Sequence, residues 1–298
     1  MNPSTRTKHD DCLLCRRNKA TATNSHIYTK WITESMFGDK HNKQGGRLDT
    51  GQFDYGSKTS DTAKENHILC PECENGRLGR NLETYVATFF YQRYRNPKYT
   101  EKFPLEKRFN WLTQEIDCVV CDPATLHPIM FKLYIYSLVW RASISNHPTY
   151  KNFKLPEDVE EKLRYALDTF LQGDDANATI AYYEAHKEDF PHFQYNIITS
   201  IDQTDATANL VTEPLNSSDG VYLMYVNEFI IVFYTKWDGS RKFDRAFNPG
   251  LHPVNLGQIE ESEWKGFVKS AMEMAVDNYV ARHKNTLATR KPQPRWNK

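Results

Sequence analysis

All six cysteines of the chain fall into three Cys-x-x-Cys pairs, a spacing suited to metal binding. The pairs are Cys12/Cys15, Cys70/Cys73 and Cys118/Cys121. A Cys-x-x-Cys turn supplies two sulfurs, one edge of a tetrahedral site, so two such turns complete a closed four-thiolate site. We expect Cys12, Cys15, Cys70 and Cys73 to hold a structural Zn²⁺, although free core thiols or a redox pair fit the same spacing.

The third pair has two interpretations. A second zinc site at Cys118/Cys121 would need two more ligands, such as His127 together with His147 or His9. Buried cysteines without a metal are common, so core thiols are the simpler interpretation. In a third arrangement, this pair would replace one of the first two.

Polar residues with chemical potential lie between and directly after the first two pairs. His26 stands near the end of a Thr-rich stretch, and Glu74 and Asn75 follow the second pair where a helix should begin. A neutral imidazole can remove a proton near pH 7. The plainer alternatives are a structural histidine and a carboxylate that complements the helix dipole.

Three motifs carry a resemblance to a known family: Ser25-His26-Ile27-Tyr28-Thr29-Lys30, Leu69-Cys70-Pro71-Glu72-Cys73-Glu74 and Leu138-Val139-Trp140-Arg141-Ala142-Ser143. The first two, with their cysteines, resemble the HNH nuclease superfamily, the ββα-metal fold. All three are similar to a little-described bacterial group labelled HNH-like. The likeness covers residues 10–95 at superfamily level and extends to about residue 170 in the narrower group.

The resemblance implies a hydrolase that cuts phosphodiester bonds in DNA or RNA. His26 would be the general base, and Asn66 lies close to an asparagine of the family motif. Glu74 or Asn75 would hold Mg²⁺ or a similar divalent ion, which offsets charge on the phosphate. HNH-like domains also suggest, by association, a role in bacterial defence against phage.

Ser25 departs from the family pattern, which usually carries a metal-ligating acid or histidine there. Either Glu74 compensates, or Asp39, His41 or Asp49 completes the site, or catalysis has been lost. In the last case the chain would be an inactive zinc-finger module that binds nucleic acid or a protein partner. A purely structural or interaction protein is a further alternative.

The net charge of zero hides an uneven distribution. Residues 1–108 carry 19 Lys/Arg against 13 Asp/Glu, a net +6, and the remainder is net −6. The sequence predicts nucleic-acid contacts from four basic residues near several tyrosines: Arg77, Arg80, Arg93 and Arg95. A solvated helix face would look similar. The acidic C-terminal half could meet a protein partner.

Hydrophobic periodicity predicts an α+β fold in two domains. Residues 1–110 should form the zinc-bound ββα unit. Residues 111–298 should be helical over 122–190, β-rich with an antiparallel sheet over 191–240, and closed by a helix over 260–284.

Within these domains, strands are expected over 20–28 and 66–69, with a polar loop at 38–62. A short helix is expected over 104–114 and a fully apolar one over 128–143.

No signal peptide or membrane span is expected. The most apolar stretch, residues 129–144, contains Lys132 and Arg141 and is too short to cross a bilayer. We therefore expect a cytoplasmic protein, and in a reducing compartment paired cysteines favour metal over disulfides.

Overall fold

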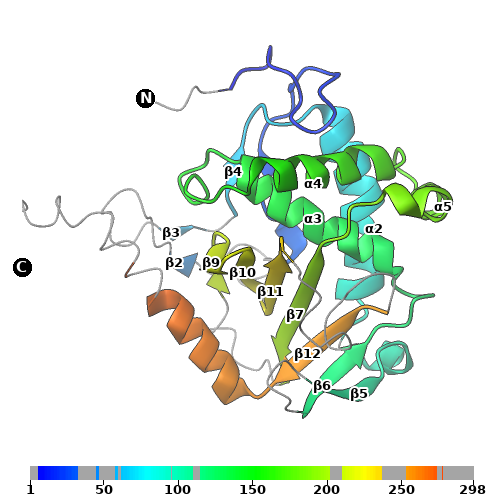
Figure 1. Cartoon of the computed structure of the whole chain (residues 1–298), viewed down its shortest axis with the longest axis vertical. Coiled ribbons are helices and arrows are strands. Elements are labelled where there is room, and N and C mark those ends of the chain that lie inside the picture. Colours follow the sequence, from blue (N-terminus) through cyan, green and yellow to red (C-terminus); the bar gives the residue numbers. More distant parts are fainter. Residues whose placement is uncertain are drawn as a thin grey trace, which may run out of the picture.

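The computed structural model describes residues 6–32, 45–46, 58–59, 62–94, 96–109, 115–201, 210–236, 253–273 and 277. The fold is mixed α+β, as the sequence predicts (Figure 1). Across the described residues, no helix is both long and apolar enough to span a membrane.

An eight-stranded sheet forms one half of the molecule. Its strands are β5 (Leu105–Phe109), β6 (Glu115–Val120), β7 (Gln194–Ser200), β8 (Leu210–Val211), β9 (Leu215–Ser218), β10 (Val221–Asn227), β11 (Phe229–Tyr234) and β12 (Asn255–Ile259). The order is β5-β6-β12-β7-β11-β10-β8, and β9 also pairs with β10. All pairs are antiparallel except β12 with β7. The antiparallel sheet expected over residues 191–240 is confirmed for β7 to β11, and the parallel pair involves β12, which lies outside that range.

Residues 105–109 correct one expectation. They form strand β5, not a helix, because they pair with β6 over the whole length of β5. Residues 110–114 of the expected helix lie outside the described residues. The expected domain boundary at 110/111 stays a prediction, although β5 and β6 pair across it.

Both faces of the sheet are covered. Alternate residues of β11 face opposite sides: Phe229, Ile231 and Phe233 join the main core, and Ile230, Val232 and Tyr234 join a second cluster. The second cluster includes Trp264 and Val268 from a helix over 261–273. This is the described part of the expected closing helix.

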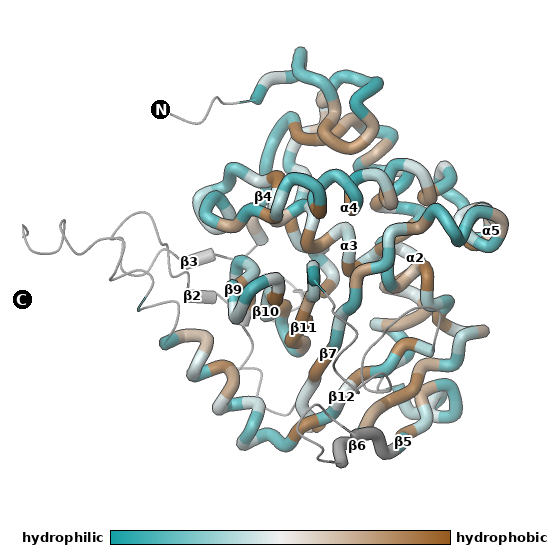
Figure 2. The backbone as a smooth tube through the Cα atoms, viewed as in Figure 1, coloured by the Kyte–Doolittle hydropathy of each residue, from teal (hydrophilic) through white to brown (hydrophobic). Residues whose placement is uncertain are grey.

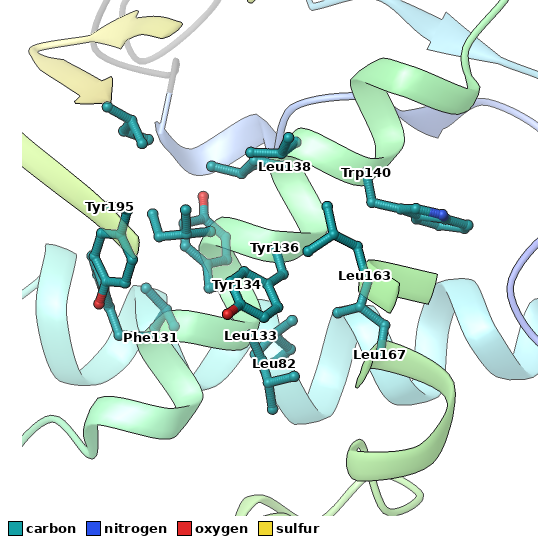
Figure 3. Packing of buried hydrophobic residues seen from close by; sticks show 14 of the residues in the cluster. Leu82, Phe131, Leu133, Tyr134, Tyr136, Leu138, Trp140, Leu163, Leu167 and Tyr195 are labelled. Carbon is teal, nitrogen blue, oxygen red and sulfur yellow. The ribbon is translucent and has the colours of Figure 1, made fainter. Parts of the chain in front are cut away.

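Three helices pack on the main core: α3 (Pro128–Ile144), α4 (Glu157–Phe170) and α5 (Ala176–His186). In α3, 16 of 17 residues are buried, which confirms the expected central helix. Figure 3 shows side chains of α3 packed between Tyr195 of β7 and Leu163 and Leu167 of α4. Figure 2 shows the more amphipathic colouring of α4.

The helix after the second cysteine pair has an unusual backbone. It runs as η1 (Glu72–Glu83), α2 (Thr84–Val86) and η2 (Ala87–Tyr91), and η1 and η2 are π-helical. We call η1 the wide helix. Its i→i+5 bonding gives about 4.4 residues per turn, against 3.6 in an α-helix. Residues nine apart therefore share a face here, whereas an α-helix would put them on opposite faces.

Short elements complete the described chain. Strand β1 (Ser25–His26) pairs antiparallel with β4 (Lys64–Glu65), and β2 (Gly45–Gly46) with β3 (Lys58–Thr59). The strand expected over 66–69 is therefore displaced to β4. Two 3₁₀ segments are η3 (Pro97–Lys102) and η4 (Lys187–Asp189).

Candidate metal centre and the adjoining polar cluster

The structure brings the first two cysteine pairs together. The sulfurs of Cys12, Cys15, Cys70 and Cys73 all lie within 4.8 Å of one another, and all four residues are buried. Cys15 Sγ and Cys70 Sγ are 3.9 Å apart. Sulfurs bound to one tetrahedral zinc at about 2.3 Å lie about 3.8 Å apart, whereas a disulfide needs about 2.05 Å. The cluster is therefore compatible with a structural zinc site.

Backbone hydrogen bonds hold the two cysteine turns against each other. Leu13 N donates to Ile68 O at 2.9 Å, and Ala22 N donates to Leu69 O at 3.1 Å. Arg16, directly after the first turn, has a left-handed φ of 54°. The segments that carry the sulfurs are thus joined on both sides of the cluster.

The thiols also affect one another's ionisation. A hydrogen bond from Cys73, with backbone N–H groups of Cys15, Cys70 and Leu14, lowers the pKa of Cys12 to about 5. The hydrogen bond to Cys12 and burial raise the pKa of Cys73. Four thiolates can share this space only with a cation between them, so the donor set fits Zn²⁺.

The third pair lies elsewhere. Cys118 belongs to β6 and Cys121 follows it, and both are fully buried. Burial raises the pKa of Cys121, which disfavours a thiolate. Within the described ranges the only group of metal-ligating residues is the first four cysteines. Core thiols are the interpretation that agrees with this placement.

The residues of β1 point in two directions, because neighbouring strand residues face opposite sides. The Ser25 hydroxyl lies near enough to Glu74 to lower its pKa, so it faces the wide helix. His26 shares the other face with its cross-strand neighbour Lys64. The imidazole of His26 and the carboxyl of Glu74 are therefore on opposite sides of β1.

A buried polar cluster, which we call the Arg141 cluster, joins β1, the wide helix and α3. The Arg141 guanidinium, 1% exposed, donates from Nη1 to His26 O at 2.9 Å and forms an ion pair with Glu83. Burial raises the pKa of Glu74, Arg141 lowers it and Glu83 raises it. Glu74 and Glu83 are nine residues apart, so the wide turn brings both carboxylates to Arg141.

Three polar atoms of this cluster are unsatisfied. Ser25 Oγ, Glu74 Oε2 and Arg141 Nε are buried and have no well-oriented hydrogen-bond partner among the described residues. Buried polar atoms without a partner are rare in native proteins. Burial and the neighbouring Glu83 raise the pKa of Glu74, so a cation bound at Glu74 Oε2 would favour its ionised form.

The His26 ring is positioned by Thr62. Nδ1 of His26 lies 2.7 Å from Thr62 Oγ1, and Thr62 Oγ1 donates to Tyr28 O at 3.4 Å. Because the hydroxyl has one hydrogen, Nδ1 of His26 donates to Thr62 in this arrangement. The neutral ring then has its lone pair on Nε2, which is the tautomer a general base needs.

Two of the four expected catalytic residues lie outside the Arg141 cluster. Asn75 is exposed on the wide helix. Asn66 is also exposed, and its Oδ1 accepts from Asn24 N at 2.8 Å, where Asn24 has a φ of 58°. Asn66 therefore stabilises a turn before β1.

The expected basic contacts are largely occupied within the chain. Arg77 Nη1 lies 2.8 Å from both Asp168 O and Asp168 Oδ1. Arg80 pairs with Asp174 at 3.0 Å, and Arg93 lies over the ring of Phe89. Arg95 lies outside the described residues.

Three residues of the site were missed by sequence reasoning. Arg141 carried a usable signal, because a charge in a helix with no polar face needs a buried partner. Glu83 had none, because α-helical spacing from Glu74 argues against a shared site. Thr62 follows a long loop, so its contact with His26 is not encoded locally.

No known protein family, curated protein or solved structure matches the chain.

Proposed function

We propose that the chain is a zinc-stabilised, HNH-like endonuclease that hydrolyses phosphodiester bonds in DNA or RNA. The observation that carries the proposal is the order of elements around the four cysteines. A strand with His26 pairs with β4, and a helix with Glu74 follows, all joined to one buried cysteine cluster. This order agrees with a ββα-metal unit.

In this proposal, His26 accepts a proton from the attacking water at Nε2, and Thr62 holds the ring in the required tautomer. Arg141 fixes the backbone of His26 through its carbonyl. Glu74 would hold a divalent ion on the side of β1 opposite to His26, so in this proposal the ion would offset charge on the substrate and would not bind the attacking water. A bacterial defence role is part of the same proposal.

Substitution of the base tests the proposal. We expect His26→Ala to lower metal-dependent cleavage of a labelled oligonucleotide at least 100-fold, because general-base catalysis contributes about 10²–10⁴. Zinc content and the unfolding midpoint should stay unchanged. His186→Ala is a control, because His186 is an exposed histidine at the end of α5 and has no role in the proposed chemistry. Undiminished cleavage by His26→Ala would refute the assignment.

A second candidate is a catalytically inactive module that binds nucleic acid or protein. One observation favours it: His26 and Glu74 face opposite sides of β1, and the Arg141 guanidinium already neutralises one carboxylate of the cluster. A titration with Mn²⁺ separates the candidates. The nuclease should bind a second ion whose binding is lost in Glu74→Gln, and the inactive module should bind none beyond zinc.

A further inference from the structure

An open groove of about 630 Å³ lies beside β4. Three segments line it: residues 6–9, residues 64–67 and residues 146–147. They come from the N-terminal segment, from β4 and the turn after it, and from the link between α3 and α4. Figure 2 shows the N-terminal segment as mostly hydrophilic.

The groove is rich in positive charge. Among the described residues that line it, the cations are Arg6, Lys8 and Lys64, and the only carboxylate is Glu65. Three imidazoles add donors and acceptors: His9, His67 and His147. Such a set suits an anion with several oxygens, such as a phosphate group.

The single carboxylate is already engaged. Glu65 Oε2 accepts from Ser145 Oγ at 2.6 Å and from Asn146 N at 3.0 Å. These bonds attach β4 to the link after α3 and keep the carboxyl at the wall. Glu65 therefore shapes the wall of the groove, and its negative charge against the three cations leaves these four side chains net +2.

The cations differ in how they are held. Arg6 is fixed by two backbone carbonyls, because Nε donates to His67 O at 2.8 Å and Nη2 donates to Asp11 O, so its guanidinium is oriented. Lys8 and His9 are exposed, and neither side chain pairs with any residue in the part of the chain that the structure describes. Lys8 and His9 can therefore turn toward a ligand without breaking an internal contact.

The groove adjoins the proposed base. Lys64 lines the groove and stands directly across from His26 in the β1–β4 pair. Directly opposed residues of an antiparallel pair have Cβ atoms about 4.5–5.5 Å apart on the same face. The groove is also lined by Glu65, which pairs with Ser25, so it reaches both faces of β4; His26 is a neighbour of the groove and not part of its lining.

We infer that the sugar-phosphate backbone of a nucleic acid binds in this groove, with Lys8, Lys64 and Arg6 against its phosphates. The inference rests on the proposed function and assigns the substrate to this face. It differs from the contacts expected from Arg77, Arg80 and Arg93, of which Arg77 is held in a largely buried ion pair with Asp168 and Arg80 in an exposed one with Asp174.

Charge changes in the groove test the inference. Affinity for a fluorescein-labelled single-stranded DNA would be measured by anisotropy without added divalent ions, from about 50 to 200 mM salt. We expect Lys8→Glu to weaken binding about 5-fold and to reduce the salt slope by about 0.7. Asn146→Arg, which adds a cation to the wall, should tighten binding about 3-fold.

The matched control is Lys269→Glu, since Lys269 is a 77% exposed lysine on the helix over 261–273. It changes net charge equally and should leave affinity unchanged. Equal losses in Lys8→Glu and Lys269→Glu would overturn the inference, as would unchanged affinity in both groove variants. Binding of inorganic phosphate without binding of the oligonucleotide would also overturn it.

Cleavage measured on the same variants separates this inference from the proposed function. If the Lys8→Glu variant loses binding and the wild type binds the oligonucleotide without cleaving it, the groove is supported as the binding site and the proposed nuclease activity is refuted. If the wild type cleaves the oligonucleotide, and Lys8→Glu and Asn146→Arg have the same KM as the wild type, the nuclease activity is supported and the groove is refuted as the binding site.

Discussion

The apolar helix α3 contains two buried charged residues, Arg141 and Lys132, which differ in whether a partner compensates the charge. Arg141 is buried but has Glu83 and the carbonyl of His26 as partners. Lys132 is 2% exposed, and none of the described side chains forms a bond or ion pair with it. Desolvation lowers the pKa of Lys132 to about 8. A charge without a partner costs stability, so the two residues should respond differently to substitution.

The pH dependence of stability should reveal this cost. The folded state lowers the pKa of Lys132 from 10.5 to about 8, so between these values the unfolded chain binds more protons and stability rises with pH. At pH 7 the full penalty, about 3 kcal/mol, is present.

We therefore expect Lys132→Met to raise the free energy of unfolding by about 2–3 kcal/mol at pH 7. Its advantage over the wild type should shrink as pH rises from about 8 to 10.5. Urea denaturation at several pH values measures both effects. Lys162→Met, at an exposed site on α4, is the control and should stay within about 0.5 kcal/mol of the wild type at each pH. A destabilised Lys132→Met would contradict this account.

At the scale of elements, the wide helix explains how Glu74 and Glu83 meet at Arg141. Such segments are rare and frequently lie at functional sites. Its two glycines differ in their surroundings. A Cβ at Gly79 would lie 2.9 Å from Glu74 O, whereas one at Gly76 would meet nothing within 4 Å. Gly79 therefore permits the close approach of successive turns.

Alanine substitutions at these glycines should have opposite effects. We expect Gly79→Ala to lower the free energy of unfolding by about 1–3 kcal/mol, because the backbone must shift away from the new methyl group. Gly76→Ala should raise it by about 0.5–1 kcal/mol, as alanine does inside an unobstructed helix. Urea midpoints with unchanged m-values measure both. A neutral Gly79→Ala would argue against the i→i+5 backbone.

At the scale of the whole molecule, the sequence predicted local features better than distant ones. The expected helix over 128–143 agrees closely with α3, because a strong apolar pattern is local. Strand β5 was missed because its partner β6 decides its conformation. The parallel pairing of β12 with β7 depends on segments far apart in the chain.

The candidate site likewise has features that the sequence predicts and features that it does not. The cysteine cluster follows from spacing alone, whereas the Arg141 cluster depends on a backbone geometry that apolar periodicity does not reveal. The engagement of Arg77 with Asp168 likewise depends on where α4 packs. Sequence therefore predicted the cysteine cluster but not the contacts that surround it.

We expect the packing of β1, β4 and the wide helix to depend on a bound zinc ion. The four thiols join the segment before β1 to the start of the wide helix. Removing the metal should therefore loosen the Arg141 cluster and β1 together, because binding energy at such a site is folding energy.

Zinc K-edge absorption on the purified protein tests this most directly. We predict one zinc per chain with four sulfur neighbours at about 2.3 Å. Cys73→Ser should lose most of the metal and several kcal/mol of stability. Cys121→Ser, the matched control, should retain the full zinc content. A site with fewer sulfurs, or zinc retained in Cys73→Ser and lost in Cys121→Ser, would contradict the account.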